Sequence, residues 1–198
     1  MNPVSEAALR RVLSEPGEGR SYAGVGSRQT PLAVCSEMTL VAAFLAGLGY
    51  QLRSGAAPRA DKSWEAGAAR AQIFLPWRGF EEHPSGLYSP PAVAFEIAAR
   101  HHPEWATLTS GERKLMARNS QQVLGPGCDD PSDFVMCWTR DRATTATSRG
   151  TGGTGQAIRV ACSYGIPVFN LADPETRRIV LELCGARTTV QGLLFNAA

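Results

Sequence analysis

Residues 21–53 read SYAGVGSRQTPLAVCSEMTLVAAFLAGLGYQLR, and this stretch decides the fold of the chain. A short β-prone run at 21–25 ends in glycines, and Thr30-Pro31 then has the pattern of an N-cap followed by proline at the first helical position. Apolar residues recur behind it at intervals of three and four, which predicts one buried face of a helix that a glycine at 47 or 49 closes. The members of this stripe are Cys35, Met38, Ala42 and Leu45. Tyr50–Arg53 is the next predicted strand, so the stretch predicts a β-α-β unit.

The same alternation of strand and helix continues along the chain. It predicts helices at about 5–13, 60–70, 154–164 and 174–184, and strands at 72–75, 134–138 and 166–171. Asp173-Pro174 has the pattern of a helix cap, and Thr188–Phe195 is expected to form an edge strand. Strands that alternate with helices predict an α/β fold with a doubly wound, mainly parallel sheet.

Residues 76–131 interrupt this alternation. Six prolines fall between Pro84 and Pro131, and two helices are expected inside the segment. One spans 92–100, and the other starts at Thr109 with a capping-box pattern completed by Glu112. We interpret 76–131 as a helical insertion packed on the sheet, so that residues 1–198 form a single domain.

Composition limits the classes of function. Of the 198 residues, 43% are hydrophobic and 19% are charged, which excludes disorder, coiled coil and collagen for the chain as a whole. Twenty Lys and Arg against 18 Asp and Glu give a net charge of +2. A general nucleic-acid coat is much more basic, so any contact with a polyanion must be local.

Cysteine usage and hydropathy indicate the compartment. The five cysteines form no CxxC pair, and no histidine stands at zinc-ligand spacing, so we expect no disulfide, no metal and no cofactor. Residues 1–20 lack the apolar core of a signal peptide, and the apolar run Leu40–Tyr50 is too short to cross a bilayer. We therefore expect a cytoplasmic protein without membrane contact.

Three loops each follow a predicted strand and open a predicted helix. They are Gly24–Arg28, Ser54–Asp61 and Arg149–Gln156. Glycines let the backbone approach an anion closely, free N–H groups at a helix start attract it, and Arg28 adds a charged fork. Because the carboxyl ends of parallel strands meet at one edge of a sheet, the three loops are predicted to converge on one crevice.

Each loop also has a purely structural interpretation. The first is compatible with a tight turn, Asp61 with a helix cap, and the third loop with a flexible surface segment. Asp61 and Glu65 stand four residues apart on one helix face and are the candidates for a catalytic carboxylate. Trp77 either stacks on a base or packs in the insertion, and Arg78 is a candidate phosphate partner. The predicted ligand-binding residues are Gly24, Gly26, Ser27, Arg28, Ser54, Gly55, Ala56, Asp61, Arg78, Gly152, Gly153, Thr154, Gly155 and Gln156.

Several of these segments resemble a known superfamily. YAGVGSRQTP at 22–31, RSGAAPRADKSWEAGA at 53–68 and GGTGQAIRVACSYGIPVFNL at 152–171 are similar to signature segments of the DprA/LOG (SLOG) superfamily, as is the strand region DDPSDFVMCWT. The resemblance covers about residues 20–172 and is closest to small DprA-like proteins often encoded in bacteriophage genomes. It implies a Rossmann-like fold whose loops bind nucleotides, nucleotide-derived signals or single-stranded DNA, in the cytoplasm of a bacterium or a phage-infected host. It also implies a homo-oligomer, a dimer or larger, because members of this superfamily often dimerise.

The chain departs from the superfamily pattern at two points. LOG phosphoribohydrolases carry a catalytic Glu in the motif PGGxGTxxE, whereas the corresponding loop here continues as Gln156-Ala157-Ile158-Arg159 without an acid. Hydrolysis of the LOG type would therefore need Asp61 or Glu65 as its carboxylate. DprA itself has flanking domains and a more basic surface, and we expect neither feature here.

Three functions remain open at this point. The first is binding, for sensing or sequestration, of a nucleotide or nucleotide-derived signal in the crevice. The second is a DNA-binding accessory of recombination or DNA processing, and the third is a nucleotide N-glycosidic or phosphoester hydrolase. The near-neutral charge counts against the second, where we expect only weak DNA binding, and the missing loop Glu counts against the third. Nucleotide binding is therefore the leading hypothesis.

Overall fold

The computed structural model describes residues 3–195, which form five β-strands and seven α-helices. The strands are β1 (Ser21–Gly24), β2 (Gln51–Ser54), β3 (Ala71–Ile73), β4 (Phe134–Cys137) and β5 (Val168–Asn170). They make one sheet in the order β3-β2-β1-β4-β5, and each neighbouring pair is parallel. The predicted α/β fold with a doubly wound, Rossmann-like parallel sheet is confirmed.

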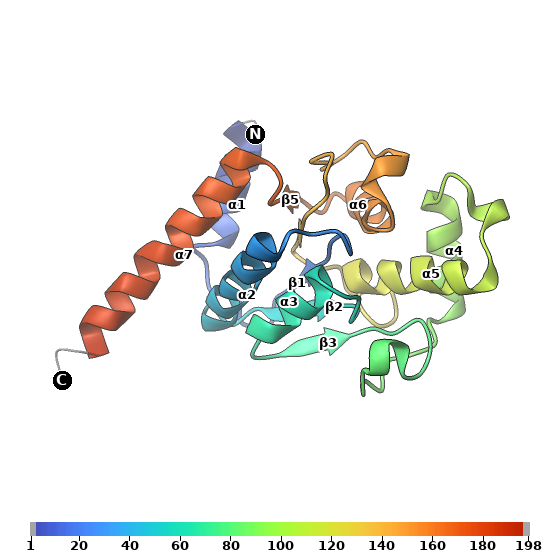
Figure 1. The fold of residues 1–198 in the computed structure, drawn as a ribbon, viewed down its shortest axis with the longest axis horizontal. Coiled ribbons are helices and arrows are strands. Elements are labelled where there is room, and N and C mark those ends of the chain that lie inside the picture. The colour runs from blue at the N-terminus through green and yellow to red at the C-terminus, as the bar shows by residue number, and fades with distance from the viewer. Residues whose placement is uncertain (1–2, 196–198) are drawn as a thin grey trace.

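The helices cover both faces of the sheet. They are α1 (Pro3–Val12), α2 (Leu32–Gly47), α3 (Ala60–Gly67), α4 (Ala92–His101), α5 (Ser110–Leu124), α6 (Thr154–Ser163) and α7 (Pro174–Phe195). Side chains of α1, α2, α3 and α7 share one buried cluster, and those of α4, α5 and α6 share the other. Figure 1 shows α1 beside α7 at one end of the molecule and α4 with α5 at the other.

The two strands at the centre of the sheet feed both clusters. Tyr22 in β1 and Phe134 in β4 point to the first cluster, whereas their neighbours Ala23 and Val135 point to the second, because side chains alternate along a strand. The Tyr22 and Phe134 rings stack with centroids 5.6 Å apart. Trp64 of α3 is fully buried in the same cluster, so the centre of the sheet is fixed by large aromatic groups on this face.

The segment 76–131 supplies two of the three helices on the second face. The predicted capping box at the start of α5 is confirmed, since Glu112 N donates to Thr109 Oγ1 (3.3 Å) and Thr109 N donates to Glu112 Oε2 (2.8 Å). Helix α5 contacts β1, β2 and α6, and α4 packs on α5 and α6. The chain therefore passes from β3 to β4 through a helix that lies directly on the sheet.

The predicted cap of α2 is wrong. The helix begins at Leu32, with Pro31 in the cap position, and no side chain caps its first turn. Thr30 Oγ1 instead donates to Ser27 O (2.7 Å), so its hydroxyl closes the loop that follows β1. The local loop competes for this hydroxyl, as is common for Ser and Thr beside turns.

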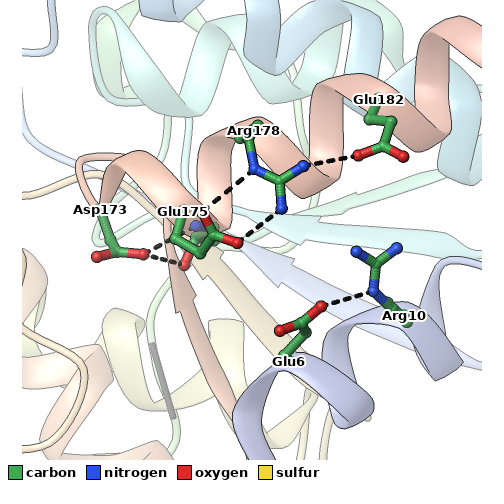
Figure 2. A network of polar contacts seen from close by, with 7 residues as sticks. Glu6, Arg10, Asp173, Glu175, Arg178 and Glu182 are labelled. Atoms are coloured by element: carbon green, nitrogen blue, oxygen red, sulfur yellow. Dashed lines mark hydrogen bonds and ion pairs between the residues drawn. The ribbon is translucent and has the colours of Figure 1, made fainter. Parts of the chain in front are cut away.

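Helix α7 starts as the sequence predicts and ends later. Thr176 N donates to Asp173 Oδ2 (2.8 Å), which caps the first turn, and Arg178 bridges Glu175 and Glu182 (Figure 2). The edge strand expected at Thr188–Phe195 is wrong, because the helix continues to Phe195 and reaches away from the sheet (Figure 1). The sequence has no proline there, and Val190, Leu193 and Leu194 recur at helical spacing, which outweighs the β-branched Thr188-Thr189 pair.

No helix within residues 3–195 combines the length and apolar character that crossing a bilayer needs.

Close packing of α3 on α2 depends on Gly67. A Cβ at this position would lie 2.1 Å from Thr39 O and 2.9 Å from Ala42 Cβ. We expect Gly67→Ala to lower the free energy of unfolding in urea by about 1–3 kcal/mol, because the two helices must move apart. The matched control is Gly47→Ala, whose Cβ would meet nothing within 4 Å and which should be neutral or stabilise by about 0.5–1 kcal/mol. Equal stability of the two variants would contradict the close approach.

Candidate functional site

A cavity of about 620 Å³ lies where the three loops meet. Its walls include residues 25–29 after β1, Ala57 and Asp61 after β2, and residues 149–154 after β4. A fourth wall comes from α5, which contributes Leu115, Met116, Arg118, Asn119 and Gln122. The volume is within the range of about 300–1,000 Å³ that is common for small-molecule sites.

The structure brings half of the predicted ligand-binding residues to this cavity. These are Gly26, Ser27, Arg28, Asp61, Gly152, Gly153 and Thr154. Other predicted residues do not line the cavity but hold the elements that form its walls. Ser54 Oγ donates to Gly24 O (2.7 Å), which ties β2 to β1, and Gln156 Nε2 donates to Ala98 O (3.1 Å), which ties α6 to α4. Gly155 sits against Thr151, and Ala56 is buried with a positive φ of 62°.

Three sequence candidates lie away from the cavity walls. Glu65 Oε1 pairs with His83 Nε2 (2.8 Å). Arg78 borders a separate groove of about 380 Å³ together with His83. Trp77 is 40% exposed and packs edge-on against Phe80, with ring centroids 5.2 Å apart. The structure therefore separates Glu65 from Asp61, although one helix carries both.

The loop after β1 approaches α3 very closely. Ser27 N donates to Trp138 O (3.2 Å), and a Cβ on Gly26 would lie 2.6 Å from Ala60 Cβ. Glycine at 26 is thus required by the packing of the protein itself. Arg28 is exposed at the cavity, and among the side chains that the structure describes it has no hydrogen-bonding or ion-pair partner.

The glycine-rich loop ends at an open helix start. Asp141 accepts hydrogen bonds from the Ser148 hydroxyl (3.0 Å) and from the Thr151 hydroxyl, which fixes the loop. Gly153 is the N-cap of α6 and offers no side-chain cap. The N–H groups of Gly153 and Thr154 have no acceptor within residues 3–195, and both residues line the cavity. Two free amides and the positive end of the helix dipole make this wall attractive to an anion.

Asp61 and Arg118 form a buried ion pair in the cavity wall. Arg118 Nη1 lies 3.1 Å from Asp61 Oδ2, and the two side chains are only 5% and 3% exposed. The same Oδ2 accepts from Ala57 N (3.3 Å) and Gln122 Nε2 (3.5 Å). Burial raises the pKa of the Asp61 carboxyl, and the Arg118 guanidinium opposes that rise.

The Arg118 guanidinium occupies the space beside Gly55, where any other residue would have a side chain. A Cβ on Gly55 would lie 1.4 Å from Arg118 Nη1, so the glycine is needed for the guanidinium to fit. The guanidinium also lies over the Phe80 ring, with the ring centroid 5.8 Å from Arg118 Cζ. Burial lowers the pKa of Arg118, and the Asp61 carboxylate opposes this effect.

Sequence reasoning missed the α5 wall. The available signal was the polar run of residues 118–122, which fills more than one helical turn in a helix that has to pack on a sheet. All five of these residues are buried. A turn of buried polar side chains indicates a polar site or network beneath the helix.

The charge and chemistry of the cavity favour an anionic ligand. Its lining residues include four arginines, Arg28, Arg118, Arg140 and Arg149, and a single carboxylate, Asp61. Arg149 also pairs with Glu104 at the surface. The lining set has no aromatic side chain, and its apolar part is aliphatic, with Leu115 and Met116 on α5.

Comparison of the chain with protein-family models, with curated proteins and with solved structures gave no match.

A double-mutant cycle tests the buried pair. Asp61→Asn and Arg118→Gln should each lower the free energy of unfolding by about 3–5 kcal/mol, because each leaves the partner buried without its counter-charge. The double variant should lose clearly less than the sum of the two. In the exposed pair formed by Glu175 and Arg178, the corresponding Gln variants should cost about 0–1 kcal/mol. Additive losses at Asp61 and Arg118 would show that the two groups do not stabilise each other.

Proposed function

We propose that the protein binds a nucleotide or a nucleotide-derived signal in the cavity at the carboxyl edge of its sheet. The observation that carries this proposal is the open start of α6, where the amides of Gly153 and Thr154 have no acceptor among the described residues and both residues line a cavity that Arg28 also lines. Backbone amides at a helix start, an adjacent arginine and a loop of glycines are the usual means by which α/β folds hold a phosphate group. The resemblance of the three loops to the DprA/LOG superfamily supports the same ligand class.

The position of the carboxylates favours binding over hydrolysis. Glu65 is engaged with His83 and does not line the cavity. Asp61 lines it, but its Oδ2 already receives hydrogen bonds from Ala57, Arg118 and Gln122. Asp61 therefore positions Arg118, and the lining residues offer no second carboxylate to act as a general acid or base.

The shape of the site favours a small ligand over single-stranded DNA. Proteins that bind single strands stack successive bases on aromatic side chains along an open groove. The residues that line this cavity include no aromatic ring, and the loops enclose it on several sides. A base in this cavity would lie against Leu115 and Met116.

A substitution that fills the anion position tests the proposal. Gly153→Val would place a side chain in open space, where a Cβ meets only Met116 Cε at 3.8 Å, and should abolish nucleotide binding without unfolding the protein. Gly111→Val, also at a helix start with nothing within 4 Å, is the matched control and should bind like wild type. Native mass spectrometry for a co-purified nucleotide and calorimetry with linear and cyclic nucleotides provide the measurements. Binding that survives in Gly153→Val would place the ligand elsewhere.

Removal of the free arginine should weaken the same interaction. Arg28→Ala is expected to reduce nucleotide affinity by about 1.5–3 kcal/mol, the usual contribution of a hydrogen bond to a charged group. Arg78→Ala removes the same charge from the separate groove and should leave the affinity unchanged. A panel of nucleotides measured by calorimetry against both variants checks this. An equal loss in both would indicate a general effect of net charge.

A further inference from the structure

Arg118 has more hydrogen-bonding capacity than the protein uses. Its guanidinium has five N–H donors, of which only Nη1 is engaged, with Asp61 Oδ2. Nε is enclosed without a partner, and Nη2 has no partner among the described residues and is not fully enclosed. The Arg118 side chain is only 5% exposed, and a side chain buried to this extent normally has its hydrogen-bond donors satisfied. Unused donors at a cavity wall therefore need an explanation.

The spare donors of Arg118 belong to a different wall from the open start of α6. Arg118 stands on α5 and is held by Asp61, which follows β2, whereas Gly153 and Thr154 follow β4. Both walls border the same cavity of about 620 Å³. The site thus offers two separate positions for an anionic group.

The balance of charge agrees with two anionic groups. Asp61 balances Arg118, and Glu104 balances Arg149. Arg28 and Arg140 also line the cavity and have no carboxylate partner among the described side chains. The helix start of α6 adds further positive potential. A single phosphate monoester would leave part of this positive charge unmatched.

We propose that Arg118 determines the ligand class of the site by binding a second phosphate group, so that the ligand is a nucleoside di- or triphosphate. This inference rests on the proposed function. The first phosphate lies at Gly153 and Thr154 with Arg28, and the second accepts a hydrogen bond from Arg118 Nη2. Asp61, Phe80 and Gly55 position the guanidinium for this contact.

Calorimetry with adenosine and guanosine mono- and diphosphates at constant ionic strength tests the inference. Wild type should bind the diphosphate at least 10-fold more tightly than the monophosphate of the preferred base. In Arg118→Gln this ratio should fall to below 3-fold. Arg78→Gln removes the same charge from the separate groove and should leave the ratio of the two affinities unchanged.

Two controls separate binding from folding. Arg53 is a second buried arginine, paired with Asp130 outside the cavity, and Arg53→Gln should leave the ratio unchanged. Where Arg118→Gln does not fold, Arg118→Lys keeps the charge but loses the fork and should still lower the ratio several-fold. Inorganic pyrophosphate should displace the bound diphosphate from wild type at lower concentration than inorganic phosphate does.

The outcomes distinguish this inference from the proposed function. Equal affinity for mono- and diphosphate, or a ratio that survives in Arg118→Gln, overturns the second phosphate position. If Gly153→Val still abolishes binding in that case, the nucleotide site itself stands. If neither these four nucleotides nor the wider panel of linear and cyclic nucleotides binds to wild type, the proposed function fails, and the inference fails with it.

Discussion

The ion pair between Asp61 and Arg118 joins the two halves of this fold. Asp61 stands on α3, which covers one face of the sheet, and Arg118 stands on α5, which covers the other. The two side chains meet at the carboxyl edge of the sheet, beyond the ends of the strands. Within the described residues, no strand separates the helices of the two faces at this edge. Two buried charges are stable there only because each is the counter-charge of the other. The position of α5, and with it one wall of the cavity, therefore depends on this pair.

Three glycines near the ion pair and the cavity lie where a side chain would change the packing or the open space. Gly55 leaves the space that the guanidinium fills, and Gly26 lets the loop after β1 lie against α3. In both places a methyl group would overlap with the protein itself. Gly153 differs, because its missing side chain opens space in the cavity. Glycines of one loop cluster thus have two effects: those at 26 and 55 allow close packing, and the one at 153 leaves open space in the cavity.

The sequence predicted the sheet and its three loops better than it predicted the site. The stripe along 35–45 and the alternation of strands and helices are local patterns, and the sheet that they predicted is the one observed. The shared edge of a parallel sheet placed the loops together. By contrast, Glu65 and Asp61 share a helix face in the sequence, but a contact with His83, 18 residues away, draws Glu65 elsewhere. Arg118 lies 57 residues from Asp61, so no local pattern could pair them.

In the proposed two-phosphate site, Arg118 would link the stability of the fold to ligand binding. Arg118 is costly to bury, and the contact with Asp61 leaves its Nε without a hydrogen-bond partner among the described residues. A phosphate group that accepted a hydrogen bond from Nη2 would supply a further partner and add a second negative charge beside the guanidinium. Any ligand of this kind binds the folded state and not the unfolded chain, so it stabilises the arrangement of α3 and α5 around the pair.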